Sequence, residues 1–331
     1  MKIYLTLDYE LFFGKSGSPQ KSILEPTDRL IEICDKHGAR CVFFVDAGYL
    51  EKLRTYSARF PQLNRDREQV VGQIRELSRA GHDIQLHVHP HWEGTIYDGS
   101  KWIFDMSRYR LDTFSDCAAL DIFERYITAI TDITQKPVSA FRAGGWCIQP
   151  FAKFHAAFDR FNITIDSTVF AGGRNSTASE WYDFTTAPDL DCWRFQTDPC
   201  RGDANGRFIE YPIASYRLSP TFFWRLALTK IVKLKSHRSF GDGTPSANSP
   251  GQLTRLLTTF STSVVSVDGY KSSFLMKAYK KMKRRQRNHF VVIGHPKALS
   301  EYSLANLNDF LSNLEADDEI STFAAAASKS K

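Results

Sequence analysis

Hydrophobic and polar positions along the chain follow two periods, one typical of helices and one typical of buried strands. Residues 69–80 carry apolar side chains at helical spacing, and Gly81 ends this predicted helix. The residues that follow, 83–87, form a short and largely apolar run, which indicates a strand. The same reasoning along the whole chain predicts seven strands, at residues 3–7, 41–45, 83–87, 138–142, 163–166, 208–213 and 290–294.

Helical patterns separate most of these predicted strands, and that alternation predicts a parallel α/β architecture with right-handed crossovers. Strand 41–45 is apolar almost throughout, as expected of a strand that is covered on both faces. We expect a single domain over residues 1–320. The last residues, 321–331, are small and polar, and we expect them to form a disordered tail.

Polar side chains stand at the end of nearly every predicted strand. They are Asp8, Glu10, His87, Arg142, Asp166 and His295. One such residue can be a cap or a satisfied core group, and Arg142 with Asp166 can form a structural ion pair. Because the C-terminal ends of parallel strands meet at one face of an α/β barrel, five strands with such endings predict an active site there.

Histidines are concentrated at the end of the third predicted strand. Residues 81–92 hold four of the nine histidines of the chain, namely His82, His87, His89 and His91. On an extended backbone the last three point the same way, because strand side chains repeat every two residues. This geometry alone favours His87 together with His89. Neutral imidazoles joined by a distant carboxylate make a divalent metal site, and the alternative is a set of solvated histidines before a loop.

The net positive charge of the chain comes from one segment. The net charge is +6, but residues 221–288 contain 14 Lys or Arg against Asp242 and Asp268, which is 14 − 2 = +12 and leaves 6 − 12 = −6 for the rest. Two basic stretches, 221–240 and 277–287, predict an anionic partner at one face. Helices on an anionic membrane surface and outer helices with a solvated face both explain them. The chain has no nucleic-acid-binding motif, so we expect no nucleic-acid partner.

The N-terminus and the lengths of the apolar runs bear on location. Residues 1–8 have the pattern of a first strand rather than of a signal peptide. No apolar run approaches the roughly 18 residues that span a bilayer. We therefore expect a cytoplasmic protein, with peripheral contact at the inner membrane face if the basic stretches bind lipid.

Five motifs, in order, resemble those of the polysaccharide deacetylases, the enzymes with a NodB homology domain in carbohydrate esterase family 4. They are Thr6-Leu7-Asp8-Tyr9-Glu10, Gly81 to His91, Arg142-Ala143-Gly144-Gly145, Asp166-Ser167-Thr168 and Val291 to His295. The resemblance implies an irregular (β/α)7 barrel for the catalytic domain over residues 1–320. Residues 217–288 would then be a basic helical insertion between the last two strands.

The resemblance also implies roles for the strand-end residues. Glu10 with two of His87, His89 and His91 would hold a divalent metal, with zinc as the first expectation and cobalt, nickel or manganese as alternatives. Asp8 would be the general base and Arg142 would orient it. His295 would protonate the leaving amine, and Asp166 would hold His295 protonated. Backbone N–H groups of Gly144 or Gly145 would stabilise the oxyanion.

The expected activity is the metal-dependent removal of an N-acetyl or similar acyl group from an amino sugar. The substrate would be a cell-surface polysaccharide, a lipid-linked saccharide or a precursor of either. Two departures from the family pattern matter: Tyr9 stands where many members have the metal-binding Asp, and His89 is additional to the usual pair, which corresponds to His87 and His91. A different metal-dependent amidohydrolase and a non-catalytic sugar-binding module are the alternative functions.

Overall fold

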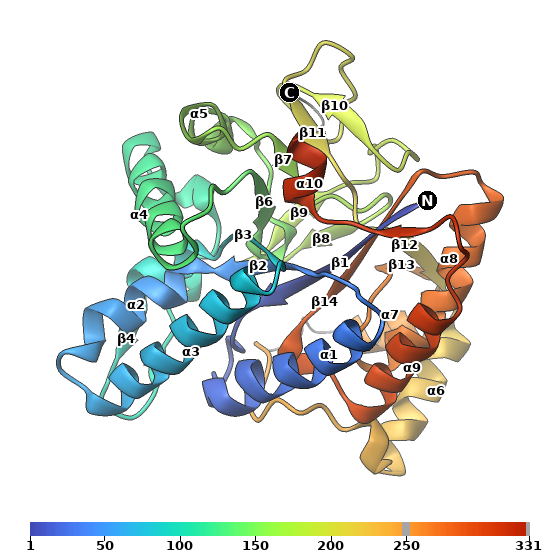
Figure 1. The fold of residues 1–331 in the computed structure, drawn as a ribbon, viewed down its shortest axis with the longest axis horizontal. Coiled ribbons are helices and arrows are strands. Elements are labelled where there is room, and N and C mark those ends of the chain that lie inside the picture. The colour runs from blue at the N-terminus through green and yellow to red at the C-terminus, as the bar shows by residue number, and fades with distance from the viewer. Residues whose placement is uncertain (247–251, 329–331) are drawn as a thin grey trace.

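The chain folds as an irregular (β/α)7 barrel, as the computed structural model describes it over residues 1–246 and 252–328 (Figure 1). Seven strands are mutually parallel, and all seven were predicted from the sequence. In spatial order they are β11 (Phe208–Glu210), β7 (Ile165–Asp166), β6 (Ala140–Ala143), β3 (Asp83–Val88), β2 (Val42–Asp46), β1 (Lys2–Tyr9) and β14 (His289–Gly294). The sheet is extended by β10 (Trp193–Phe195), antiparallel to β11, and by β15 (Glu319–Ile320), parallel to β1.

The two ends of this sheet approach each other. The chain just after β11 forms a parallel bridge from Ile213 to Val291 of β14, and the N–H of Ala214 donates to the carbonyl of Val291 at 2.9 Å. The N–H of Val265 then donates to the carbonyl of Ala214 at 2.7 Å. These bonds curl the sheet into a barrel, so that side chains from distant strands face one interior.

Helices form an outer layer around the sheet (Figure 1). They are α1 (Glu25–Lys36), α2 (Ala47–Ser57), α3 (Pro61–Arg79), α4 (Asp116–Thr134), α5 (Ala152–Phe161), α8 (Leu275–Arg284) and α9 (Glu301–Ser312). The predicted helix at 69–80 is the second half of α3, whose Val70, Ile74 and Leu77 are buried. Burial of these apolar stripes against the sheet, rather than helix propensity, stabilises the layer.

Residues 217–288 hold a group of elements between β11 and β14. They include the second half of β12 (Ser215–Leu218), β13 (Ser261–Val264), α6 (Pro220–Ile231), α7 (Gln252–Thr258) and α8. β12 and β13 pair with each other apart from the main sheet. Leu218, Phe222 and Phe223 form a small apolar cluster that is separate from the main core.

Short elements complete the fold. Two further hairpins are β4 (Ile96–Tyr97) with β5 (Trp102–Ile103) and β8 (Arg174–Ser176) with β9 (Trp181–Asp183). A π-helical turn spans Gln20–Leu24, and 3-10 turns span Pro90–Gly94, Met106–Arg108, Leu111–Thr113, Gly144–Trp146, Lys235–His237, Gly269–Phe274 and Pro296–Ala298.

The C-terminal segment is ordered where the sequence predicted disorder. Residues 321–331 were expected to form a disordered tail, but Phe323–Ser328 form helix α10 and the Phe323 side chain is fully buried. The Phe323 ring stacks on Tyr4 at 4.8 Å, and the N–H of Ala324 donates to Asp83 Oδ2 at 2.8 Å. The expectation was wrong because it relied on the small, polar composition of the tail, whereas burial of one aromatic side chain, Phe323, holds the segment against the barrel. Residues 329–331 lie outside the described residues.

Replacement of Phe323 by Ala tests this anchor. We expect Phe323→Ala to lower the free energy of unfolding by about 3 kcal/mol, because a buried phenyl ring is lost and a cavity remains. Urea unfolding of the full chain measures the change. Ala325→Ser, an exposed position in the same helix, is the matched control and should change stability little. Equal stabilities of Phe323→Ala and the wild type would contradict the assignment.

Candidate active site

A pocket of about 190 Å³ opens at the C-terminal ends of the barrel strands. Its walls include Asp8, Glu10, His87, His89 and His295. These residues come from the ends of β1, β3 and β14, which the parallel sheet brings to one face. Four aromatic side chains also line it, namely Phe12, Phe13, Tyr109 and Trp146, together with the charged Glu180 and Lys297.

Glu10, His87 and His89 form a compact group at the base of this pocket. Their ligand atoms all lie within 4.8 Å of one another, and all three side chains are buried. Glu10 Oε2 is 3.2 Å from His87 Nε2 and 2.6 Å from His89 Nε2. One oxygen and two imidazole nitrogens at this spacing are a donor set that suits a divalent transition metal.

The pleat of β1 decides which of its residues reach the pocket. Asp8 and Glu10 face the interior, whereas the Tyr9 side chain points to the opposite side and its hydroxyl donates to Gln73 Oε1 at 2.8 Å. The alternation of strand side chains explains this arrangement. Tyr9 is therefore a core residue, and Glu10 stands at the position that faces the imidazoles.

Gly144 allows His89 to enter the group. A Cβ atom at Gly144 would lie 2.4 Å from His89 Nδ1, which is closer than any side chain tolerates. The turn Gly144–Trp146 directly follows β6, the neighbour of β3 in the sheet. The glycine that the sequence motif contains thus has a steric reason in the close approach of this imidazole.

The hydrogen bonds of His87 define which of its nitrogens faces the pocket. His87 Nδ1 donates its proton to the carbonyl of Arg142 at 2.9 Å, so Nε2 is the nitrogen that points toward Glu10. A backbone partner of this kind orients a metal-binding imidazole. Burial lowers the pKa of His87, but the carboxylates of Asp8 and Glu10 outweigh it and raise the pKa to about 9. A metal ion would therefore have to displace a proton from His87.

His89 is already in the form that binds a metal. Burial lowers its pKa to about 4, so the imidazole is neutral at neutral pH. Both ring nitrogens are buried and lack a hydrogen bond of good geometry, even though Nε2 lies close to Glu10. Buried polar atoms are rarely left in this state. A cation between His89, His87 and Glu10 would satisfy Nε2, so the residues present fit a bound metal.

His91 lies outside this group. Its ring stacks on Tyr109 at 5.3 Å with an interplanar angle of 14° and packs against Phe13, Trp92 and Phe104. His91 is the second residue of the 3-10 turn Pro90–Gly94. At this point the chain has left the extended conformation that would align His91 with His87. The structure thus brings together His87 and His89, the pair that strand geometry favours, and not His87 with His91.

Asp8 is held by Arg142, as the sequence predicts. Arg142 Nη1 donates to Asp8 Oδ1 at 2.6 Å, and both side chains are buried. The guanidinium also donates to Thr6 Oγ1 at 2.9 Å and to the carbonyl of Ser167 at 2.7 Å. A buried ion pair with its remaining donors satisfied fixes the carboxylate in one orientation. Asp8 Oδ2 is left free to face His87 and His295, at 3.8 Å and 3.7 Å from their Nε2 atoms.

The carboxylate partner of His295 is Asp268, and the expectation that Asp166 fills this role was wrong. His295 Nδ1 lies 2.8 Å from Asp268 Oδ2. Burial lowers the pKa of His295, but the hydrogen bond and charge of Asp268 outweigh it and raise the pKa above its usual value. Asp268 follows the Ser266–Ile293 bridge and so stands beside the end of β14, whereas Asp166 ends β7 in another part of the barrel.

Asp166 belongs to a separate buried pair with Glu210. The two residues are opposite each other on β7 and β11, and Thr168 donates to Asp166 Oδ1 at 2.7 Å. Burial raises the pKa of both carboxyls, and the charge of Asp166 raises that of Glu210 further. Asp166 is also not bonded to Arg142 among the described residues, so the alternative of a direct ion pair between them does not hold either.

Three acidic or basic residues near the pocket were not predicted from the sequence. Lys297 Nζ lies 2.8 Å from Glu10 Oε1 and leaves Oε2 as the oxygen that faces the imidazoles. Asp46, at the end of β2, is opposite His87 in the sheet, and burial raises its pKa to about 7. Its position at a strand end was a usable signal. Lys297 lies in the turn Pro296–Ala298 and Asp268 in an irregular stretch, and no sequence pattern singled them out.

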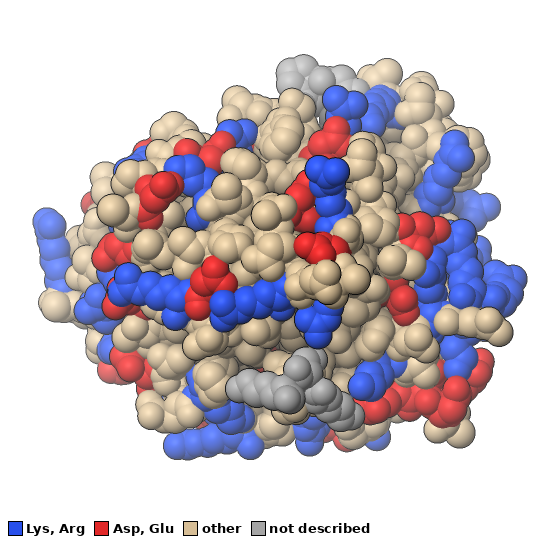
Figure 2. Space-filling model, turned by 90° about the horizontal axis from the view of Figure 1, so that it is seen from above, with Lys and Arg blue, Asp and Glu red and all other residues tan. Residues whose placement is uncertain are grey.

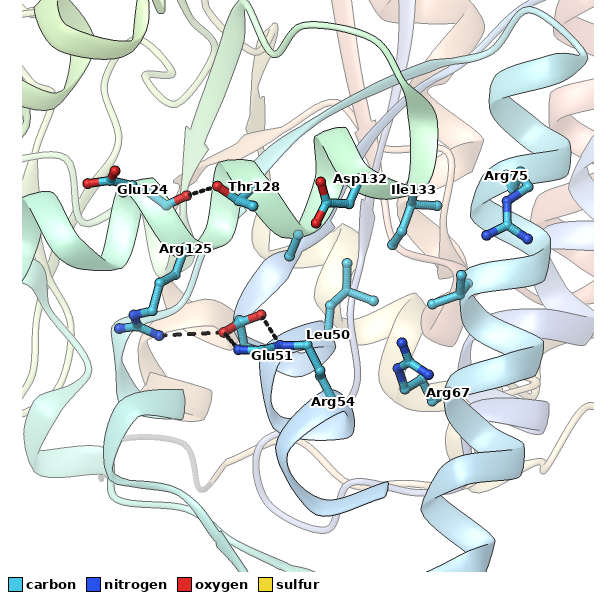
Figure 3. A pocket seen from close by; sticks show the side chains of 12 residues that line it. Leu50, Glu51, Arg54, Arg67, Arg75, Glu124, Arg125, Thr128, Asp132 and Ile133 are labelled. Atoms are coloured by element: carbon cyan, nitrogen blue, oxygen red, sulfur yellow. Dashed lines mark hydrogen bonds and ion pairs between the residues drawn. The ribbon is translucent and has the colours of Figure 1, made fainter. Parts of the chain in front are cut away.

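A second groove, between α2, α3 and α4, holds none of the candidate site residues (Figure 3). Its walls carry both signs of charge, and Arg54 and Arg125 lie on either side of Glu51. The residues that line this groove include no histidine or cysteine. The barrel pocket is therefore the candidate active site.

Metal titration of alanine variants tests which imidazoles bind. We expect His89→Ala to weaken Zn²⁺ binding by more than about a hundredfold, since even loss of an outer hydrogen-bond partner costs about 10–100-fold. His91→Phe keeps an aromatic ring in the stack and should bind Zn²⁺ as the wild type does. Isothermal titration of metal-free protein measures both affinities. Weaker binding by His91→Phe with unchanged binding by His89→Ala would show that the ion uses the other pair.

The comparisons with known proteins rest on structure. No protein-family model matches the chain, and no curated protein matches it in sequence. Among solved structures, the chain matches a Mycobacterium smegmatis protein assigned as a polysaccharide deacetylase, with 15% identity and a TM-score of 0.52 over 99% of this chain and 89% of that chain. The structural match confirms the fold that the ordered sequence motifs imply.

Two further structures with other activities share this architecture. PuuE allantoinase matches with 11% identity and a TM-score of 0.50 over 99% of this chain and 89% of that chain. The 4-α-glucanotransferase from Thermococcus litoralis matches with 10% identity and a TM-score of 0.51 over 99% of this chain and 40% of that chain. Likeness at such identities establishes fold and not activity. The fold of this chain is the one shared by the polysaccharide deacetylases.

Proposed function

We propose that this protein is a metal-dependent hydrolase that removes an N-acetyl or similar acyl group from an amino sugar. The observation that carries the proposal is the convergence of three units on one pocket. These are the Glu10–His87–His89 group, the Asp8–Arg142 pair and the His295–Asp268 pair. Hydrolysis of an amide needs a polarised carbonyl, a base for water and an acid for the amine, and these units match the three needs.

Glu10, His87 and His89 would hold the metal, with zinc as the first choice for this donor set. A divalent ion bound there would polarise the acyl carbonyl and lower the pKa of a water molecule. Asp8 is placed to take the proton of the attacking water, because Oδ2 faces the group while Oδ1 is held by Arg142. The bond from Arg142 holds this base in one orientation. Backbone N–H groups at Gly144 or Gly145 remain our candidates for stabilising the oxyanion.

His295 is the proposed acid for the departing amine. Its Nε2 lies 3.7 Å from Asp8 Oδ2, and both residues line the same pocket. Asp268 accepts from Nδ1 and stabilises the protonated imidazole. A proton held on His295 Nε2 can then pass to the amine nitrogen as the C–N bond breaks.

The pocket walls support a sugar as the substrate. Phe12, Phe13, Tyr109 and Trp146 line it, and their flat faces suit the apolar C–H surface of a pyranose ring. The volume of about 190 Å³ fits one sugar residue with its acyl group better than a long chain buried in full. We therefore propose that the substrate enters with one end, as a terminal or accessible residue of a cell-surface polysaccharide, a lipid-linked saccharide or a precursor.

Replacement of the proposed base tests the reaction. Zinc-loaded wild-type protein should release acetate from an oligomer of N-acetylglucosamine, and Asp8→Asn should lower the rate by about 10²–10⁴-fold, since the water loses its proton acceptor. Glu301→Gln, at an exposed position on α9, should keep full activity. An enzymatic acetate assay measures all three proteins. A zinc-loaded wild type that binds the oligomer without releasing acetate would instead identify a sugar-binding module.

The pH dependence tests the assignment of Asp268. His295 must be protonated to act as an acid, so activity should fall as pH rises through its pKa. Asp268 raises that pKa, and Asp268→Asn should therefore shift the alkaline limb of the pH–kcat profile to lower pH. Asp166→Asn should leave the position of this limb unchanged. A shift in Asp166→Asn and none in Asp268→Asn would overturn the assignment.

A further inference from the structure

The outer face of α6 is apolar and has no cover among the described residues. Five large apolar side chains of α6 and the residues after it are between 44% and 76% exposed. We call them the α6 apolar face: Trp224, Leu228, Ile231, Val232 and Leu234. Trp224, Leu228 and Ile231 follow one another at helical spacing and share one side of the helix. Contiguous exposed apolar side chains of this kind mark interaction surfaces.

The opposite side of the same helix is already used for packing. Phe222 and Phe223 are buried in the small cluster with Leu218, and Leu226 packs against it. The helix is thus apolar on two sides, and only one of them is covered by this chain. A helix that is apolar all round is normally buried, so the second side calls for a partner outside the chain.

Unpaired cations surround the α6 apolar face. Residues 219–241 contain no Asp or Glu, and five cations lie in this stretch: Arg225, Lys230, Lys233, Lys235 and Arg238. None of them forms an ion pair with a carboxylate of the described part of the chain. All five are exposed. A basic, solvent-exposed rim around apolar side chains matches the chemistry of a surface with anionic headgroups over an apolar layer.

The other basic stretch of the sequence differs in this respect. Figure 2 shows Lys and Arg side chains gathered at the right-hand edge of the molecule, the side on which α8 lies in Figure 1. At the end of α8 and just after it, Lys283 pairs with Glu315, Asp317 and Asp318, and Arg285 and Arg287 pair with Asp189. Three of the seven cations in residues 277–287 are thus paired within the chain. None of the five in α6 and the residues after it is paired among the described residues, so α6 is the stronger candidate for an external anionic partner.

We propose that α6 and the residues that follow it, up to Arg238, dock on the surface of an anionic phospholipid bilayer. The α6 apolar face would enter the headgroup boundary, and the five cations would meet the lipid phosphates. A second copy of the chain is a poorer partner, because two such faces would bring like charges together. The docking is peripheral: among the described residues, no helix combines the length and the apolar character that crossing a bilayer requires.

The chain links this surface directly to the barrel pocket. After Arg238, the N–H of Phe240 donates to the carbonyl of Leu299 at 2.9 Å, and Thr244 pairs with Lys15. Pro245 and Ser246 then line the pocket itself. Docking through α6 would therefore bring the pocket rim near the bilayer, which favours a lipid-linked saccharide as substrate. That consequence for the substrate rests on the proposed function, whereas the docking does not.

Vesicle flotation of the full chain tests the proposal. The wild type should float with vesicles of phosphatidylcholine and phosphatidylglycerol at low salt, and should not float with pure phosphatidylcholine. High salt should weaken the binding, because it screens the attraction to the headgroups. No flotation with the anionic vesicles at low salt would overturn the proposal.

Matched variants locate the binding surface. The double variant Leu228→Asp, Ile231→Asp should bind anionic vesicles at least tenfold more weakly, and Lys233→Gln, Lys235→Gln should also bind more weakly. The controls are Ile96→Asp, Ile103→Asp, an exposed apolar pair on the β4–β5 hairpin, and Lys36→Gln, Lys101→Gln; both should bind as the wild type does. Equal flotation of the α6 variants and the wild type would overturn the proposal.

Two further readouts separate this proposal from its alternatives. Light scattering in solution should find the same mass for the wild type and for Leu228→Asp, Ile231→Asp. A wild-type dimer that becomes a monomer in this variant would show that a second copy covers the α6 apolar face, and would overturn membrane docking. Acetate release from a soluble oligomer of N-acetylglucosamine should be equal in the two proteins. Lost flotation with retained acetate release supports docking as a property separate from catalysis.

Discussion

The centre of the structure is a set of buried charges at the C-terminal end of the barrel, and each of them depends on a partner from another strand. Glu10 is in contact with Lys297 and two imidazoles, and Asp8 is in contact with Arg142. Burial of an unpaired charge costs several kcal/mol, so each group requires the others to be in place. The barrel must therefore close in one register, because any shift in β1 or β3 would leave a charge without its partner.

Differences in pairing and burial give the carboxyl groups in and around the pocket different pKa values. Lysine and imidazoles outweigh burial and hold the pKa of Glu10 well below its usual range, as suits a metal ligand. The His295 hydrogen bond outweighs burial and lowers the pKa of Asp268, so Asp268 stays charged and supports the imidazolium. Asp46, whose main influence is burial, has a pKa raised to about 7. Partner and depth, rather than residue type, separate these acids.

On the surface, too, some charged and apolar groups have partners within the chain and others do not. Lys283, Arg285 and Arg287, at the end of α8 and just after it, have carboxylate partners within the chain, and the cations around α6 have none among the described residues. Apolar side chains follow the same division, since Phe222 is buried while Ile231 is 76% exposed on the same helix. The groups that the fold itself leaves unmatched lie together on one surface, which is why that surface points to an external partner.

Much of the architecture was decided by local sequence patterns. The seven parallel strands were predictable because a strand buried on both faces must be continuously apolar, and Asp8 with Glu10 could be assigned to one side because side chains alternate along a strand. His87 with His89 followed from the same alternation. These inferences succeeded because each depends on neighbours within a few residues.

Only the tertiary structure decided which side chains contact one another around the site and at the C-terminus. Asp268, not Asp166, meets His295, because the bridge at Ser266 places that segment beside β14. Lys297 reaches Glu10, His91 leaves for an aromatic stack after Pro90, and Phe323 anchors a tail that composition predicted to be disordered. Some of these contacts join residues that are far apart in sequence, where no helix or strand periodicity links them. The others depend on a turn that interrupts the alternation of strand side chains. Local pattern therefore determined the elements and the strand-end chemistry, and barrel closure determined which charged groups meet.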